Sequence, residues 1–198
     1  NLFDEDVIRR GVKEIRVDTT VQEKNITFPT DRKLIEKVIE HSKRLARKED
    51  IKLKRTFGRE IKKLKHQLRF ARKPKNMKKH EKAQKRLHRI AFKIYIDLVK
   101  QLNPIPKKYQ EELDVLYRAL TQQRDDKNKV YSIHEPGTLC ISKGKEHKPY
   151  EFGNKSSFAY TRESGIIVGA MAIEGNIYDG RTLKPQLEQV KELTSGKI

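Results

Sequence analysis

The spacing of apolar residues changes twice along this chain of 198 residues, and those changes limit the folds open to it. Residues 13–21 alternate, with Ile15, Val17 and Val21 on one side and polar residues between them. From residue 31 to about residue 127 the apolar residues recur every three or four positions, and alternation returns from Tyr131. Period two is typical of strands and a period near 3.6 of helices. The pattern predicts an α/β protein of the α+β kind, in which a helical block interrupts one sheet.

Four amphipathic helices are predicted within the block. Thr30 or Asp31 caps the first, and Pro-containing segments at residues 73–76 and 103–106 end the second and third. Their narrow apolar seams are typical of helical hairpins or a small bundle. The four seams are Leu34, Ile35, Val38, Ile39, Leu45 and Ala46; Phe57, Ile61, Leu64, Leu68 and Ala71; Ala83, Leu87, Ile90, Ile94 and Leu98; and Tyr109, Leu113, Leu116 and Leu120.

The segments on either side of the block are predicted to share one sheet, because a lone strand or hairpin is marginal in water. Residues 139–142 form a short strand, and aromatic residues alternate with smaller ones over residues 150–161. The apolar run at residues 166–173 is expected to be covered on both faces. Thr182 caps a last helix with the stripe Leu183, Leu187, Val190 and Leu193. Residues 1–30 and 131–198 therefore frame an insertion at residues 31–130, and residues 1–11 end a preceding helix at Gly11.

Positive charge is concentrated in this insertion. Residues 31–130 hold 32 Lys and Arg against 13 Asp and Glu, while the rest of the chain is balanced at 14 of each. Residues 41–90 alone contain 21 basic and 4 acidic residues. A sustained excess of one sign repels itself unless a partner of opposite charge is bound. The charge therefore favours a nucleic-acid partner over a set of solvated helix faces.

Six short segments, in this order around a basic helical insertion, resemble DDE-type transposases of the insertion-sequence-five group. They are VDTTV (17–21), NITFPTD (25–31), YSIHEP (131–136), ISKGKEHK (141–148), YEFGNK (150–155) and YDGRTL (178–183).

The resemblance implies a ribonuclease-H-like core, a mixed sheet with helices, whose carboxylates bind two Mg²⁺ or Mn²⁺ ions. Asp18 occupies the position of the first catalytic Asp and metal ligand; its alternative role is that of an exposed strand residue. The second Asp, in an Asp-x-Gly-Tyr block, and a later Glu are expected to lie beyond Ile198. The core is then incomplete here: the complete parent cleaves element ends and joins them to target DNA, and this chain alone binds DNA without cleaving it.

Asp179 and Glu151 are the other acidic residues considered near this core. Asp179 is expected to be a turn residue in its Asp-Gly setting rather than a second catalytic Asp. Glu151 is expected to be an exposed strand residue. Basic side chains are expected to contact DNA phosphates without reading sequence. Those of the helical block are Lys62, Lys63, Lys65, Arg69, Arg72, Lys78, Lys79, Lys82, Lys85, Arg86 and Arg89, and those of a loop beside the sheet are Lys143, Lys145, His147 and Lys148.

Two other functions stay open from the sequence: a non-enzymatic basic nucleic-acid-binding protein, and a remnant of a mobile element without function. No two of the six His residues are four apart and Cys140 is the single Cys, so neither a zinc site nor a disulfide is expected. The lone Cys fits a reducing, cytoplasmic compartment. No signal peptide and no apolar run near the ~20 residues of a membrane span is visible. Element ends, target DNA and a second copy of the chain are the expected partners.

Overall fold

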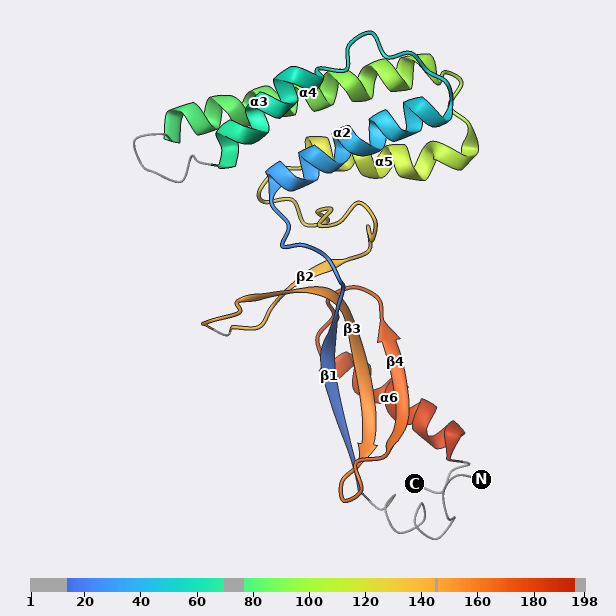
Figure 1. Cartoon of the computed structure of the whole chain (residues 1–198). Helices are drawn as coiled ribbons and strands as arrows, with labels where there is room; N and C mark the ends of the chain where they lie inside the picture. The colour runs from blue at the N-terminus through green and yellow to red at the C-terminus, as the bar shows by residue number, and fades with distance from the viewer. Residues whose placement is uncertain (1–13, 70–76, 145, 195–198) are drawn as a thin grey trace. The chain divides into compact units, whose positions relative to one another are not determined.

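The computed structural model describes residues 14–69, 77–144 and 146–194, which form an α+β protein (Figure 1). Two compact units divide the chain: residues 1–26 with 137–198, called here the sheet unit, and Thr27–Pro136, called here the helical unit. Four antiparallel strands and five helices lie in the described residues. The helix end predicted before Gly11, together with Ala71, Arg72 and Lys145, lies outside them.

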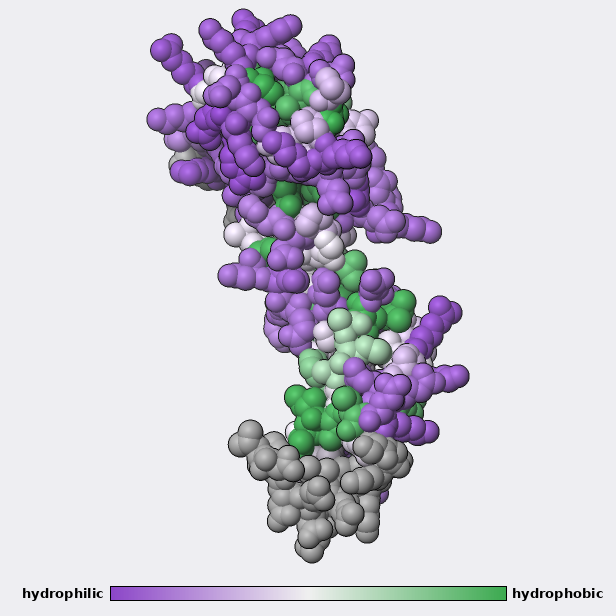
Figure 2. Space-filling view, turned by 90° about the vertical axis from the view of Figure 1, so that its right-hand side faces the viewer, coloured by the Kyte–Doolittle hydropathy of each residue, from purple (hydrophilic) through white to green (hydrophobic). Residues whose placement is uncertain are grey.

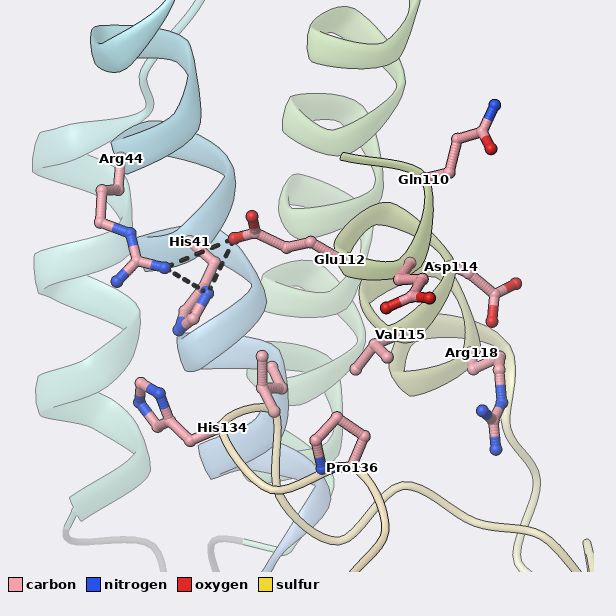
Figure 3. Close-up of a pocket in the computed structure, with 11 residues that line it drawn as sticks. His41, Arg44, Gln110, Glu112, Asp114, Val115, Arg118, His134 and Pro136 are labelled. Carbon is pink, nitrogen blue, oxygen red and sulfur yellow. Dashed lines mark hydrogen bonds and ion pairs between the residues drawn. The ribbon is translucent and has the colours of Figure 1, made fainter. Parts of the chain in front are cut away.

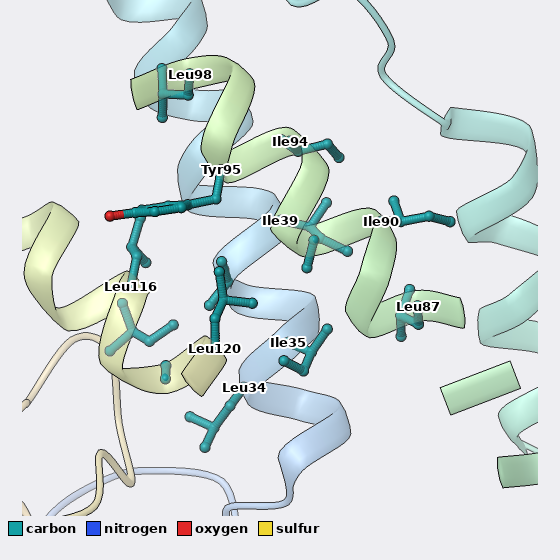
Figure 4. Close-up of a cluster of buried hydrophobic side chains, with 14 of the residues drawn as sticks. Leu34, Ile35, Ile39, Leu87, Ile90, Ile94, Tyr95, Leu98, Leu116 and Leu120 are labelled. Carbon is teal, nitrogen blue, oxygen red and sulfur yellow. The ribbon is translucent and has the colours of Figure 1, made fainter. Parts of the chain in front are cut away.

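The helical unit contains the four predicted helices, α2 (Asp31–Lys48), α3 (Gly58–Arg69), α4 (Met77–Gln101) and α5 (Lys107–Thr121). Thr30 caps α2, since its side chain accepts a hydrogen bond from the Lys33 N–H at 3.3 Å. The predicted seams of α2, α4 and α5 are buried together in one core (Figure 4). Ile61, Leu64 and Leu68 from α3 belong to the same core. The periodicity of the block is thereby confirmed.

Helix α4 is the central element of this core. It packs against α2, α3 and α5, and Leu87, Ile90, Ile94 and Leu98 are at most 1% exposed. Tyr95 lies at the border of this core and donates its hydroxyl to the Leu113 carbonyl of α5 at 3.1 Å. The buried phenol thus keeps a partner for its polar end. With its apolar side enclosed by three neighbours, α4 has one face left for solvent.

The sheet unit is built on the long central strand β3 (Tyr150–Thr161). β1 (Ile15–Glu23) runs antiparallel to it along one edge, from Ile15 opposite Thr161 to Glu23 opposite Gly153. β2 (Leu139–Ser142) pairs with the beginning of β3, and β4 (Ile167–Ile173) with the rest. A mixed sheet was expected, but every pairing between the described strands is antiparallel. What the structure establishes is an antiparallel α+β sheet unit with one covering helix.

Helix α6 (Gly180–Leu193) covers one face of this sheet. Its packing differs from three predictions, on its apolar stripe, on its cap and on the covering of β4. Its buried side is formed by Thr182, Gln186 and Val190. Of the predicted stripe, Val190 is buried, but Leu183 is 45% and Leu193 66% exposed, so the prediction is wrong at these two positions. The helix begins before Thr182, whose hydroxyl donates to the Asp179 carbonyl instead of capping. β4 was expected to be covered on both faces, yet Ile167 on the other face is 61% exposed.

On the central strand β3 the covered face consists of small and polar residues, which lets the helix come close to this strand. Ser157 and Ala159 of β3 are fully buried there. At Gly169 of β4 an added Cβ would lie 2.6 Å from Gln186 Nε2 and 2.7 Å from Val190 Cγ2. Helix α6 therefore approaches the sheet closely only where β4 has no side chain.

We expect Gly169→Ala to loosen α6 from the sheet and to cost about 1–3 kcal/mol, as overpacking in a filled interior does. Gly137→Ala is the matched control, because nothing lies within 4 Å of a Cβ added there. Amide hydrogen exchange across β3 and β4 reports on the sheet unit separately from the helical unit. Equal exchange rates in the two variants would show that the close approach of α6 is unimportant.

Candidate nucleic-acid interface

Asp18 lies at the open edge of the sheet. The Arg162 N–H donates to the Glu14 carbonyl at 3.0 Å and the Lys24 N–H to the Phe152 carbonyl at 2.9 Å, so even-numbered residues of β1 bond to β3. Odd-numbered residues then direct their N–H and C=O groups away from β3. Among the described strands none pairs with that outer edge. Asp18 Oδ1 accepts the outward N–H of Thr19 at 2.8 Å, which places its carboxylate at this edge.

Asp179 lies on the opposite face of the sheet from Asp18. Lys155, on the face covered by α6, donates to Asp179 Oδ1 and to the Ile177 carbonyl at 2.8 Å. The hydrogen bond from Lys155 holds the pKa of Asp179 below its ordinary value, and Thr19 contributes a second one. Asp18 shares its face with Phe158 instead. Asp179 thus binds Lys155 on the face of the sheet away from Asp18.

A two-ion site does not fit the described residues. Two-metal phosphoryl transfer needs ions about 3.5–4 Å apart, held by several carboxylates. No group of three His, Cys, Asp or Glu side chains suited to a metal occurs in the described part of the chain. Asp18 stands there as a single carboxylate, and no catalytic step follows from it.

The loop beside the sheet is neutralised in part by carboxylates. Glu151, expected to be exposed, is 9% exposed and lies 3.8 Å from Lys143 Nζ and 3.9 Å from Lys148 Nζ. Lys148 also pairs with Glu23, which raises the pKa of Lys148. Glu151 was assigned to the wrong face because the covered side of β3 is its small and polar side. Of the predicted loop cations, His147 remains exposed without such a pair in the described residues.

Six of the seven exposed Lys and Arg residues of α4 form a single row on the face opposite the core. At 100° per residue their positions fall within one narrow sector, and the core residues Leu87, Ile94 and Leu98 lie on the other side. The first and last are separated by about 33 Å at 1.5 Å per residue. None forms an ion pair with another described residue. This row, called here the α4 cation row, comprises Lys78, Lys82, Lys85, Arg89, Lys93 and Lys100.

Two of the predicted DNA contacts are instead paired within the helical unit. Arg86 donates twice to Glu60 of α3, at 2.6 and 3.0 Å, and this bidentate pair raises the pKa of the guanidinium. Lys65 Nζ lies 3.2 Å from Glu36 and 3.5 Å from Glu40 of α2. These two side chains tie neighbouring helices together. Exposed cations without such pairs in the described residues remain on α3 and the start of α4, namely Lys62, Lys63, Arg69 and Lys79.

A pocket of about 740 Å³ between α2, α5 and the segment after α5 was not foreseen from the sequence (Figure 3). His41 is buried at its wall, and Arg44 Nη2 lies 3.0 Å from His41 Nδ1 and 3.4 Å from Glu112 Oε1. His41 Nδ1 also lies 3.3 Å from Glu112 Oε1, so it accepts from Arg44 in one tautomer and donates to Glu112 in the other. Burial lowers the pKa of His41, and Arg44 and His134 act in the same direction, against Glu112.

Comparison of the chain with known proteins identifies no relative. No family model, no curated protein and no solved structure matches the chain. None of the helices in the described residues has the length and apolar character that crossing a membrane requires.

The lowered pKa of His41 predicts how stability depends on pH. The unfolded chain takes up a proton at His41 near pH 6.5, whereas the folded helical unit resists protonation until a lower pH. The stability that neutral His41 contributes is therefore fully present above pH 6.5. It is lost as the pH falls from 6.5 through the lower pKa of His41 in the folded protein. In urea denaturation, the stability advantage of the wild type over His41→Gln should shrink between pH 7.5 and pH 5. A difference that is constant over this range would contradict the buried, neutral ring.

Proposed function

We propose that the helical unit binds DNA along its phosphate backbone, and that the chain is part of a DNA transposase of the insertion-sequence-five group. The α4 cation row is the observation that carries the first part: its six side chains are exposed and unpaired among the described residues. The six resembling segments support the second part. In the complete parent, cleavage of element ends and joining to target DNA would use Mg²⁺ or Mn²⁺.

The α4 cation row matches a duplex backbone in charge and length. Duplex DNA carries one negative charge per about 1.7 Å of its axis, so a row of about 33 Å faces many phosphates. Lys and Arg contacts to phosphates release counterions and position a protein without reading bases. The rest of the unit supports this role, because Arg86 and Lys65 brace the helices from within instead of adding free charge.

The position of Asp18 supports the transposase part of the proposal. A mixed sheet needs at least one parallel strand, and the outer edge of β1 offers unpaired backbone groups to such a strand. Asp18 directs its carboxylate to the same edge. A strand added there would bring its own side chains beside Asp18, which is where further carboxylates are required.

A non-enzymatic nucleic-acid-binding protein is the second candidate. One observation favours it: the α4 cation row lies in the helical unit, whereas Asp18 belongs to no group of carboxylates suited to a metal among the described residues. Such a protein would bind DNA through the same face of α4, so binding does not distinguish the two candidates. Metal-dependent chemistry at Asp18 in a longer chain does.

Binding to a duplex oligonucleotide should weaken steeply as salt rises. The triple variant Lys78→Gln, Lys82→Gln and Lys93→Gln should show a shallower slope of log affinity against log salt, by about 0.9 for each phosphate that the variant no longer neutralises. The control is Lys107→Gln, Lys184→Gln and Lys191→Gln, which removes the same charge from exposed positions outside the α4 cation row. Fluorescence anisotropy at several salt concentrations measures both slopes. If both triple variants lower the slope equally, the row has no special role.

With Mg²⁺ or Mn²⁺ alone, this chain should not nick supercoiled plasmid DNA, because a single carboxylate cannot hold two ions. Gel electrophoresis of the plasmid after incubation with each ion is the measurement. Nicking by the wild type that disappears in Asp18→Ala, and persists in the control Asp31→Ala, would contradict this expectation.

A further inference from the structure

A second hollow of the helical unit, about 900 Å³ in volume, opens beside the α4 cation row. It lies between the first turns of α2, the middle of α4 and the end of α5. Lys85 and Arg89, two members of the α4 cation row, line it together with the aromatic rings of His88 and Phe92. The hollow thus joins a cationic border to an aromatic wall, and the sequence patterns gave no sign of it.

The two rings form a fixed aromatic surface. His88 and Phe92 lie one helical turn apart on α4. Their ring centroids are 6.5 Å apart and the ring planes differ by 29°. His88 Nε2 lies 2.7 Å from the Leu120 carbonyl, which only accepts, so Nε2 carries a proton and the ring is held in place. Phe92 packs against the apolar core, and both rings are half-buried. Neither side chain needs to be ordered by a ligand, which lowers the entropic cost of stacking.

The charges around the hollow separate a place for phosphate from a place for a neutral ring. Lys85 and Arg89 extend the α4 cation row to its border, where a phosphate finds two cations. Asp31 and Glu81 also line the hollow and disfavour a phosphate inside it. Carboxylates accept hydrogen bonds from the amino groups of cytosine and adenine. A nucleotide fits this arrangement with its phosphate outside and its uncharged base inside.

We propose that this hollow takes one unpaired base of a DNA strand, stacked on His88 and Phe92, while the α4 cation row holds the neighbouring phosphates. The inference rests on the proposed function, since the row brings the strand to the site. A base inside a duplex is stacked and paired and does not reach such a wall. The occupant is therefore a single-stranded segment or a base that has left its helix, bound by stacking with little sequence preference.

The test compares single-stranded and duplex oligonucleotides of equal length at one salt concentration. Phe92→Leu removes the ring and keeps an apolar side chain, and should weaken single-strand binding by about 5- to 100-fold, the equivalent of removing one base–aromatic stack. Duplex affinity should stay within about twofold, as it depends on phosphate contacts. Tyr117→Leu is the matched control, because this exposed ring of α5 lies outside the hollow.

A 2-aminopurine base in the single strand gives a second readout on the wild type, whether or not the variant folds. Its emission should fall on binding, because the base stacks. Emission that does not change, or single-strand affinity that is equal in Phe92→Leu and Tyr117→Leu, would overturn the base site. If duplex binding with a steep salt dependence persisted in that case, the proposed function would stand. Loss of binding to both oligonucleotides in the wild type would refute the proposed function itself.

Discussion

The packing of α4 against α2, α3 and α5 is the interaction on which the rest of the helical unit depends. Leu87, Ile90, Ile94 and Leu98 are enclosed by the three neighbouring helices, and this fixes the rotation of α4 about its own axis. Every cation on the opposite side is thereby held toward solvent. Hydrophobic burial thus sets the position of the charges, and the charges alone could not form such a row because they repel one another. Hydrophilic side chains dominate the surface of this unit in Figure 2.

The sheet unit follows a different rule, in which small side chains decide what is covered. Gly169, Ser157 and Ala159 let α6 lie close to the sheet, so Gln186 and Val190 of this helix are buried while Leu183 and Leu193 are exposed. Apolar surface is visible on this unit in Figure 2. The outer edge of β1 adds unpaired backbone groups to it, with the Asp18 carboxylate at the same edge. Exposed apolar area and an open strand edge are both typical of surfaces that further chain or a partner covers.

Periodicity predicted the parts of this fold that local sequence determines. The seams of α2, α4 and α5, the cap at Thr30 and the facing of β1 follow from the spacing of apolar residues, since such spacing reflects one buried side. Periodicity did not predict the buried face of α6, because Gly169 of β4 determines which face of the helix packs on the sheet. The pair of Arg86 with Glu60 and the bond of Lys155 to Asp179 join residues far apart in the chain, so neither was visible beforehand. The predicted DNA contacts of the helical block ended at Arg89, and the exposed face of α4 adds Lys93 and Lys100 to them.

Lysine reactivity in the presence and absence of duplex DNA tests the central claim most directly, because it reports on each amine separately. Limited acetylation of the intact chain, followed by mass spectrometry, gives the rate at each position. Duplex DNA should slow modification of Lys78, Lys82, Lys85, Lys93 and Lys100, while Lys184 and Lys191 on α6 should react at unchanged rates. Protection spread evenly over both units, or confined to the sheet unit, would contradict the assignment of DNA binding to the exposed face of α4.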